Sequence, residues 1–303
     1  MADDKLMTMA EAVDRFVPDR AAVAMCTCYE ALIPFAAGHE IMRQKKRKLT
    51  LVGPISDILF DQMIGAGTCA KIQAAWVGNV ITGSGYNFRR ACEGKTLKVE
   101  DHSNFTISLA LTAGAMGVPF MPSRTALGSD LFKTNDMLKT FSCPVTGQTL
   151  TAVKAICPDV AIIHLQRADR YGNCHIWGNT GITKEACLAS SRIIVTAEEI
   201  VHKKVITSDP SRVLFPGFKV SAVVHLPFGG WPSPVPGYYN RDHDAFLEYR
   251  KESMTRDSFL QWLEKYIYTT ENFDEFLSLT GKDRLKGLKP GTNIYSERVN
   301  YGY

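Results

Sequence analysis

The fold class is indicated most directly by residues 99–131, VEDHSNFTISLALTAGAMGVPFMPSRTALGSDL. This stretch opens with the acidic pair Glu100 and Asp101 and a polar helix cap, continues as an apolar helix, passes into a short strand and ends in a Gly-Ser turn. Its polar groups are concentrated at the two ends and are nearly absent between them. Doubly wound α/β proteins present substrate-binding groups in this way, on loops at the carboxyl ends of their strands.

Strands and helices alternate along the chain on both sides of this stretch. Thr8 and Glu11 form a capping box before a first helix. Residues 159–166, DVAIIHLQ, form a continuous apolar run, as expected for a strand covered on both faces. Such alternation predicts an α/β fold with an open, mostly parallel sheet flanked by helices. Further strands are predicted at 21–29, 49–55, 71–77, 96–99, 118–122, 192–197 and 219–226, and helices at 34–43, 57–65, 105–116 and 184–190.

The last quarter of the chain changes character. The turn-rich segment 229–240, GGWPSPVPGYYN, is followed by amphipathic helices around 245–252, 256–268 and 273–279. We therefore expect one α/β domain over residues 1–240 and a helical C-terminal extension over residues 241–303, packed on the same domain.

The composition excludes several classes of protein. The chain has 303 residues, of which 45% are hydrophobic and 22% charged, and this is ordinary for a globular protein. Its net charge of +4 is small and dispersed, so no nucleic-acid binding is expected. No apolar run approaches the roughly 20 residues that span a bilayer, and the N-terminus lacks a signal-peptide pattern. Because most of the eight cysteines lie in or beside apolar segments, we expect a cytoplasmic protein with reduced thiols and no membrane association.

The familiar catalytic and nucleotide-binding signatures are absent, and polar turns after strands remain. The first turn, residues 78–90, is GNVITGSGYNFRR. Its glycines permit positive φ angles and a close backbone approach, and Asn79 and Ser84 offer neutral donors. A flexible turn explains the glycines equally well, and Arg89 and Arg90 more often form structural ion pairs than ligand contacts.

The second turn begins the apolar helix with Ser103 and Asn104. The backbone amides at a helix start attract anions, and these two side chains add donors. Alternatively, Ser103 only caps the helix and Asp101 compensates its dipole. His102 is a candidate general base, although a lone histidine in a turn is usually a satisfied polar residue.

The third turn, residues 122–131, carries Arg124 directly after a short strand. Its guanidinium can bind a carboxylate through two hydrogen bonds, and the turn at Gly128 and Ser129 can direct a backbone amide at an oxyanion. A buried ion pair between Arg124 and Glu100 or Asp101 is the competing interpretation.

No metal site is expected. Cys26-Thr27-Cys28 is a close pair of thiols, but no second Cys/His pair at zinc spacing accompanies it. The segment Asp242-His243-Asp244 starts a helix, where acidic residues are favoured without any metal. His164 and His225 lie inside predicted strands and are interpreted as core histidines.

Taken together, these segments resemble the A (alpha) subunits of class I CoA-transferases, and those of the glutaconate CoA-transferase family most closely. The similarity extends over nearly the whole chain and keeps the order and spacing of its motifs. The matching motifs are EIMRQ, FRRACEGKTLKVEDHS, LTAGAMGVPFMPSR, LGSDL, DVAIIHLQRADRYGNCHIWG, IVTAEEI, SDPSRVLFPGFKVSAVV and the P-x-G-x-Y near Tyr238.

The resemblance implies half of an active site. Members of this family are hetero-oligomers of A and B subunits, in which the B (beta) subunit supplies a glutamate that attacks the acyl-CoA. The resulting anhydride is opened by CoA thiolate to give a glutamyl-CoA thioester, and the acceptor acid then reverses these steps. This chain lacks the Ser-Glu-Asn-Gly element expected around that glutamate, which supports its assignment to the A type. Coenzyme A is then a substrate, no cofactor is permanently bound, and the B subunit is an obligatory partner.

The resemblance also implies which residues meet the substrate. No catalytic residue is expected on this chain. A dicarboxylic or oxo acid of a catabolic pathway needs a cationic anchor, for which Arg124 is the first choice. The predicted substrate-binding residues are Asn79, Ser84, Ser103, Asn104, Arg124 and Ser129.

Two observations leave the chemistry open. Where the family usually has a Gly-Gly-Phe turn, this chain has Cys26-Thr27-Cys28-Tyr29-Glu30, which implies an altered pocket. Related heterodimers hydrolyse or decarboxylate acyl-CoAs, some with a glutamate on the A chain near the start of the helix that begins here at Ser103. The aligned residue is Asn104, which cannot act as a nucleophile or base, but Glu100 and Asp101 lie a little upstream. A hydrolase or decarboxylase is therefore the alternative function.

Interpretations from other classes have less support. A sugar-phosphate sensor would carry a helix-turn-helix segment, which neither end of the chain shows. A phosphosugar isomerase would need a lysine in its phosphate loop, and residues 78–90 contain none. A purely structural subunit, whose partner carries the whole site, remains a further alternative.

Overall fold

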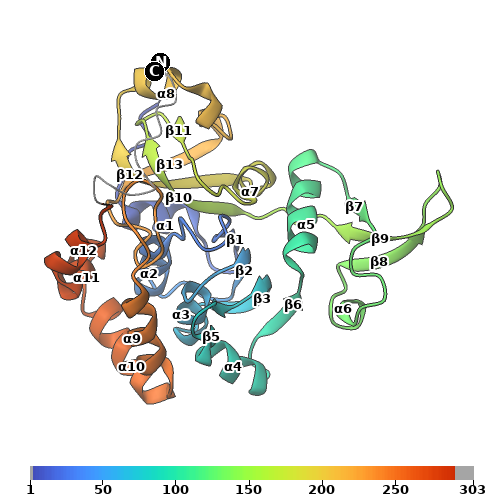
Figure 1. Ribbon diagram of the computed structural model, residues 1–303, viewed down its shortest axis with the longest axis horizontal. Coiled ribbons are helices and arrows are strands. Elements are labelled where there is room, and N and C mark those ends of the chain that lie inside the picture. The colour runs from blue at the N-terminus through green and yellow to red at the C-terminus, as the bar shows by residue number, and fades with distance from the viewer. Residues whose placement is uncertain (1–2, 291–303) are drawn as a thin grey trace.

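The computed structural model describes residues 3–290, and one large sheet forms its centre. Within these residues the sheet has eight strands in the order β13-β12-β10-β1-β2-β3-β6, with β11 antiparallel to β10 (Figure 1). Every other neighbouring pair is parallel. The predicted open, mostly parallel sheet is thus confirmed. The strands are β1 (Ala22–Ala24), β2 (Leu49–Ile55), β3 (Cys69–Trp76), β6 (Lys98–Asp101), β10 (Val160–Ala168), β11 (Cys174–His175), β12 (Arg192–Ile200) and β13 (Val220–His225).

Helices flank this sheet on both sides. The strand order runs outward from the β10–β1 pair in both directions, so right-handed crossovers place the connecting helices on opposite faces. On one face α2 packs against α1 and α3, and on the other α5 packs against α7. These helices are α1 (Met9–Phe16), α2 (Phe35–Arg43), α3 (Leu59–Gly65), α4 (Tyr86–Glu93), α5 (Asn104–Met116), α7 (Thr183–Ala189) and α8 (Lys203–Thr207).

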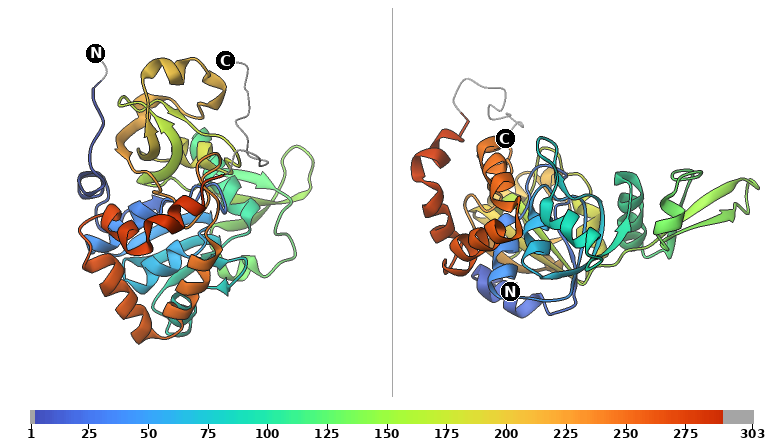
Figure 2. Two further views of the ribbon diagram at one scale, coloured as in Figure 1. Left: turned by 60° about the vertical axis from the view of Figure 1, so that its left-hand side comes forward. Right: turned by 90° about the horizontal axis from the view of Figure 1, so that it is seen from below.

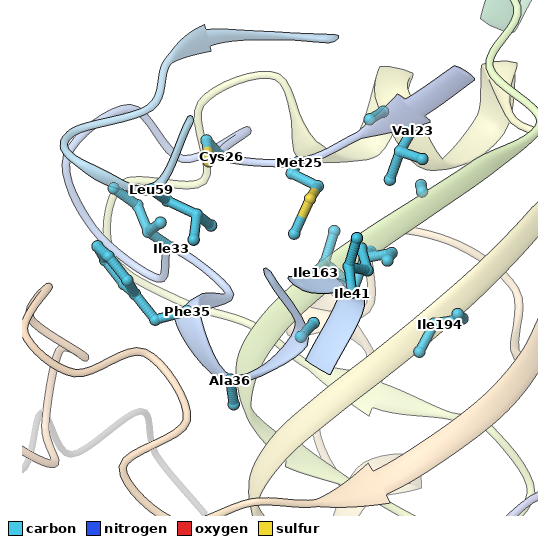
Figure 3. Close-up of a cluster of buried hydrophobic side chains, with 14 of the residues drawn as sticks. Val23, Met25, Cys26, Ile33, Phe35, Ala36, Ile41, Leu59, Ile163 and Ile194 are labelled. Carbon is cyan, nitrogen blue, oxygen red and sulfur yellow. The ribbon is translucent and has the colours of Figure 1, made fainter. Parts of the chain in front are cut away.

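The core lies between the sheet and these helices (Figure 3). It is built from aliphatic and aromatic side chains that are almost completely removed from water, and this burial supplies most of the driving force for folding. Members with at most 2% exposure include Val23, Met25, Ile33, Phe35, Ile41, Leu59, Ile163 and Ile194.

Two strand predictions need correction. The strand predicted at 21–29 ends at Ala24, because Cys26 and Tyr29 take left-handed φ angles of 57° and 62° that break an extended chain. The strand predicted at 118–122 exists as β7 (Phe120–Ser123), but it lies outside the parallel sheet. It pairs antiparallel with β9 (Thr149–Lys154), which also pairs with β8 (Leu138–Ser142).

These three strands form an arm, defined here as residues 119–155, that extends away from the body (Figures 1 and 2). The arm includes the short helix α6 (Leu131–Thr134) and contacts α5 through β7 and β9. Its side chains are mostly exposed or half-buried, with Leu138, Thr151 and Val153 among the buried exceptions. The arm therefore has little core of its own.

The C-terminal helices form a tail on the side of the body opposite the arm (Figures 1 and 2). The predicted helices are confirmed as α9 (His243–Ser253), α10 (Arg256–Leu263) with its π-helical continuation Glu264–Tyr268, and α11 (Phe273–Thr280). A further helix, α12 (Lys282–Gly287), follows. Residues 291–303 of the predicted extension lie outside the described residues. Within the described part of the chain, every helix is too short or too polar to cross a membrane.

A buried polar network fixes the segment that leads into the tail. His164 of β10 hydrogen-bonds Thr196 Oγ1 through Nδ1 at 2.9 Å and Glu198 Oε1 through Nε2 at 2.7 Å. The same carboxylate accepts the Tyr239 hydroxyl and the Phe228 backbone N–H, each at 2.8 Å. His164 is thus a satisfied core histidine, as the sequence predicts, and the network ties residues 228–239 to the sheet. The same prediction is wrong for His225, which is exposed at the end of β13.

Candidate active site

The loops at the carboxyl ends of β3 and β6 carry the predicted site residues Asn79, Ser84, Ser103 and Asn104, and the loop after β2 lies beside them. Asp57, two residues beyond β2, is 1% exposed and accepts hydrogen bonds from Asn79 Nδ2 at 2.5 Å and from Arg241 Nη1 at 2.8 Å. Burial raises the pKa of Asp57 to about 6, against the opposing effects of Arg241 and Asn79. This cluster joins the ends of two strands to the start of the tail.

Asn79 belongs to a hairpin that closes this edge, β4 (Gly78–Asn79) with β5 (Gly83–Ser84). Its side-chain oxygen accepts the backbone N–H groups of Ile81 and Thr82, at 2.8 and 3.3 Å. Glycine is required at position 78, because φ is 151° and a Cβ would lie 2.4 Å from the carbonyl oxygen of Gly83. The structure therefore gives Asn79 a role in shaping the hairpin, while its contact with substrate stays a prediction.

Ser84 lines an open pocket of about 620 Å³ beside the hairpin. The pocket lies along β3 and β6, with α4 on one side and the last residue of α6 on the other. Most of its wall is apolar. The lining residues are Ile72, Ala74, Ala75, Trp76, Val77, Ser84, Phe88, Cys92, Lys95, Leu97, Val99, Asp101 and Thr134.

Ser103 and Asn104 begin α5 directly after β6. Ser103 is the N-cap, since its Oγ accepts the Thr106 N–H at 3.0 Å and its own N–H donates to Thr106 Oγ1 at 2.9 Å. The predicted cap is thus confirmed. Asn104 is exposed, so its side chain is available to a ligand or a partner chain. Ser103 and Asn104 follow Asp101 by two and three positions in the sequence, and Asp101 is part of the pocket wall.

His102 lies in the same turn and is 3% exposed. Its Nδ1 is 3.2 Å from Thr106 Oγ1, and its Nε2 has no hydrogen-bond partner within residues 3–290. Burial lowers the pKa of His102 to about 4, so the imidazole is neutral at pH 7.

Arg124 and Ser129 lie in the loop of the arm that leads into α6. Arg124 follows β7, is exposed, and forms no ion pair or side-chain hydrogen bond within the described residues. The competing ion pair is not seen, because Glu100 is held by Lys71 at 2.7 Å and Lys98 at 3.5 Å. The exposed Ser129 hydroxyl donates to the Ala126 carbonyl at 2.7 Å. This loop leads into α6, whose last residue, Thr134, lines the pocket, and contact of Arg124 and Ser129 with substrate stays a prediction.

The buried carboxylates at this edge are occupied by protein donors. Asp61 accepts the Phe88 N–H at 2.7 Å, the Tyr249 hydroxyl at 2.8 Å and Asn87 Nδ2 at 3.1 Å, and burial raises its pKa. Burial also acts to raise the pKa of Glu100, but Lys71 and Gln73 outweigh it and the pKa lies below its ordinary value. Neither carboxylate, nor Asp57, is free to attack a substrate.

Sequence reasoning missed the residues that hold this edge together. The sequence pattern places Asp57 at the start of a helix and gives Arg241 no role. An acidic residue soon after an apolar strand could have indicated that Asp57 belongs to the site. Arg90 donates to Asn87 Oδ1 at 2.7 Å and to the carbonyls of Ser253 and Met254. It has a structural role, as expected, but through hydrogen bonds rather than an ion pair.

The cysteine pair does not open onto the pocket. Cys26, Thr27 and Cys28 are at most 3% exposed, and the Cys28 thiol lies 3.0 Å from Thr183 Oγ1. All eight cysteines are free thiols. Within residues 3–290 no group of three or more His, Cys, Asp or Glu side chains is placed to hold a metal ion.

The chain is similar to known proteins over most of its length. Residues 6–226 match the family model described as coenzyme A transferase. The chain belongs to the coenzyme A transferase family. Family membership confirms the resemblance on which the site residues were predicted, and with it the general class of enzyme.

Individual members of the family are similar to this chain over most of its length. The chain is 42% identical over 275 residues to the A subunit of 3-oxoadipate CoA-transferase from Pseudomonas knackmussii, covering 90% of this chain and 96% of that protein. The crystal structure of glutaconate coenzyme A-transferase from Acidaminococcus fermentans has a TM-score of 0.92 at 30% identity, covering 96% and 97% of the two chains. A crystal structure of the decarboxylase AibA/AibB, C56S variant, has a TM-score of 0.76 at 28% identity, covering 88% and 100%.

Proposed function

We propose that this protein is the A subunit of a hetero-oligomeric acyl-CoA:carboxylate CoA-transferase. Its B subunit supplies the glutamate that becomes acylated and then carries CoA as a thioester. This chain contributes the hairpin, the start of α5 and the arm loop. The observation that carries the proposal is the match over 90% of the chain to a protein named as a CoA-transferase A subunit. The buried carboxylates of Asp57, Asp61 and Glu100 are held by protein donors, which agrees with a nucleophile supplied by another chain.

The surface around the pocket supports a partner subunit. Val80 and Ile81 at the hairpin tip are 63% and 48% exposed, and Phe105 and Met116 of α5 are 57% and 63% exposed. The helix α5 is rich in apolar residues, a composition typical of helices that are buried. The arm also has little core of its own. We therefore expect the B subunit to cover the arm and these exposed apolar groups.

The substrate acid is proposed to be dicarboxylic, and an oxo acid of the 3-oxoadipate type fits best. The relative with 42% identity is named for 3-oxoadipate. The exposed guanidinium of Arg124, unpaired within residues 3–290, suits the second carboxylate of such an acid, because arginine binds carboxylates through two parallel hydrogen bonds. Arg124 therefore selects dicarboxylates over monocarboxylates in this proposal.

The test is to trap the covalent intermediate. The chain is co-expressed with the product of the adjacent gene, the complex is incubated with acyl-CoA and reduced with borohydride, and both subunits are weighed by intact mass spectrometry. Borohydride reduces a glutamyl thioester to a primary alcohol and releases CoA. Relative to the unmodified carboxyl group the alcohol has one oxygen fewer and two hydrogens more, so the partner loses mass only after exposure to acyl-CoA. Turnover without any change of the partner's mass refutes the transferase proposal, as does failure of a complex to form.

A second candidate function, hydrolysis or decarboxylation of an acyl-CoA, is favoured by one observation. Asp101 lines the open pocket, and its carboxylate has no hydrogen bond or ion pair to another side chain within residues 3–290. Partial burial raises its pKa, and a related structure is that of a decarboxylase. An Asp101→Asn variant separates the two functions, since it preserves thioester formation on the partner in a transferase and abolishes turnover in the alternative.

We further propose that residues 1–240 and 241–303 fold as one cytoplasmic domain with a catabolic role. Arg241 holds Asp57, the Tyr249 hydroxyl lies 2.8 Å from Asp61, and Arg256 Nη1 donates to the Gly65 carbonyl at 2.6 Å. Truncation after residue 240 is expected to abolish cooperative unfolding in urea. A truncated chain that still unfolds cooperatively would separate the two parts.

A further inference from the structure

Arg241 lies where the tail begins, and its guanidinium reaches the loops that follow two strands of the sheet. Nη1 donates to Asp57 Oδ2 at 2.8 Å, in the loop after β2. Nη2 donates to the backbone carbonyl of Glu30 at 2.6 Å, in the loop after β1, and lies 3.5 Å from the Glu30 carboxylate. The side chain is 12% exposed, and its guanidinium lies over the Phe246 ring of α9, 5.1 Å from the ring centre. A group packed on the tail thus holds two loops of the body.

The bond to Asp57 extends this connection to a third loop. The other carboxylate oxygen of Asp57 accepts Asn79 Nδ2 at 2.5 Å. The side-chain oxygen of the same asparagine accepts the backbone N–H groups of Ile81 and Thr82, at 2.8 and 3.3 Å. The backbone of Asp57 also forms an antiparallel bridge with Gly78, the first residue of the hairpin. The chain of contacts that starts at the guanidinium therefore ends at the tip of the hairpin that follows β3.

The loops joined in this way are those on which substrate contacts are expected. Ser84, at the end of the hairpin, lines the open pocket and is a predicted substrate-binding residue. Tyr29 and Glu30, in the turn after β1, are half-exposed, whereas the residues before them in that turn are buried. The guanidinium lies between these two groups of residues and is hydrogen-bonded toward both.

We propose that Arg241 is a positioning residue for substrate binding, which sets the spacing between the turn after β1 and the hairpin after β3. The inference rests on the proposed acyl-CoA substrate. Arginine suits this position because its planar guanidinium donates in several fixed directions at once. A lysine keeps the positive charge beside Asp57, but a single ammonium group on a flexible stem does not hold both loops at a fixed spacing.

Amide hydrogen exchange in the full-length chain alone is the first test, read at single residues by mass spectrometry. Because Arg241→Lys keeps the charge beside Asp57, the variant is expected to fold. The amides of Ile81 and Thr82 are expected to exchange about tenfold faster than in the native protein. A loss of global stability alone would instead accelerate the slow amides of the central strand β10 and leave the hairpin amides, which open locally, at their native rates.

Arg256→Lys is the matched control. Arg256 also ties the tail to the body, since Nη1 donates to the Gly65 carbonyl at the end of α3 at 2.6 Å. None of its hydrogen bonds within residues 3–290 reaches the turn after β1 or the hairpin. This variant is expected to keep the native exchange rates of the hairpin amides and the native KM.

Steady-state kinetics of the complex with the B subunit is the second test. Misplaced binding loops weaken the ground state and the transition state alike, so Arg241→Lys is expected to raise KM for acyl-CoA about tenfold and to leave kcat within about twofold. A purely structural role would lower the fraction of folded enzyme, and with it kcat, at an unchanged KM.

Three results would each overturn the proposal: native exchange rates at Ile81 and Thr82 in Arg241→Lys, an equal acceleration in Arg256→Lys, or an unchanged KM. A native complex without turnover would refute the proposed function instead. In that case the exchange rates, which need neither partner nor substrate, still decide whether Arg241 positions the hairpin.

Discussion

The pH dependence of stability at Asp57 tests the hydrogen bonds that connect Asp57, Asn79 and Arg241 at the edge of the site. It is 1% exposed, and burial raises its pKa from an ordinary 3.8 to about 6. A carboxyl group whose pKa is raised by folding stabilises the folded state when protonated, and this contribution is lost as pH rises through the folded pKa. The shift is about two units, and at 1.36 kcal/mol per unit it corresponds to about 3 kcal/mol.

The perturbation is Asp57→Asn, which keeps the shape and the acceptor for Asn79 but removes the titration. The unfolding free energy of the native protein is expected to fall by about 3 kcal/mol, relative to the variant, between about pH 4 and pH 7. Urea unfolding at closely spaced pH values measures this difference. Asp14→Asn, at a side chain 83% exposed, is the control for loss of a surface carboxylate.

Arg241→Met extends the test, because it removes the guanidinium that opposes the upward shift of the Asp57 pKa. In that variant the loss of stability is expected to continue to higher pH, and breaking the buried pair costs about 3–5 kcal/mol at pH 7. Parallel pH profiles for the native protein and Asp57→Asn would refute the reasoning. So would a native stability that rises across this window relative to the variant.

Three further predictions concern the arm, the helix cap and the buried network. Arg124→Ala is expected to lower kcat/KM for a dicarboxylic acceptor about 30–100-fold in steady-state assays of the complex, with a smaller effect on a monocarboxylic acceptor and partial rescue by Arg124→Lys. Ser103→Ala removes the N-cap of α5 and is expected to cost about 1 kcal/mol in urea unfolding. Glu198→Ala leaves His164, Tyr239 and a backbone N–H without their acceptor and is expected to cost about 2–5 kcal/mol, seen as a lower Tm.

Local signals made much of the fold predictable. The capping box at Thr8 and the N-cap at Ser103 act over three residues, so the sequence shows them directly. The strand β2 has the predicted bounds, because a continuous apolar run between turns marks a strand buried on both faces. The resemblance to a known family predicted the same open sheet flanked by helices, and the order of the strands within it was not predicted.

Contacts between distant residues were not predictable in the same way. The bond between Arg241 and Asp57 joins residues 184 positions apart, and nothing near either residue announces the other. The arm was missed because β8 and β9 are mostly exposed or half-buried and lack the apolar pattern of strands with a core. Asn79 and Ser103 lie in the turns where the sequence predicts them. Only the structure shows that their side chains accept hydrogen bonds from the backbone of those turns.

The turn after β1, at which the resemblance predicts an altered pocket, holds its two thiols in the interior of the loop. Cys26 takes a left-handed φ of 57°, which a glycine adopts without strain, and burial raises the pKa values of the Cys26 and Cys28 thiols, the latter to about 11. These side chains therefore act as inert packing groups, not as pocket walls or nucleophiles. The residues of this turn that remain half-exposed are Tyr29 and Glu30, and Glu30 is 3.5 Å from Arg241. A difference in substrate choice that arises from this turn is thus expected to depend on Tyr29 and Glu30, because the thiols cannot reach a ligand without unpacking the loop.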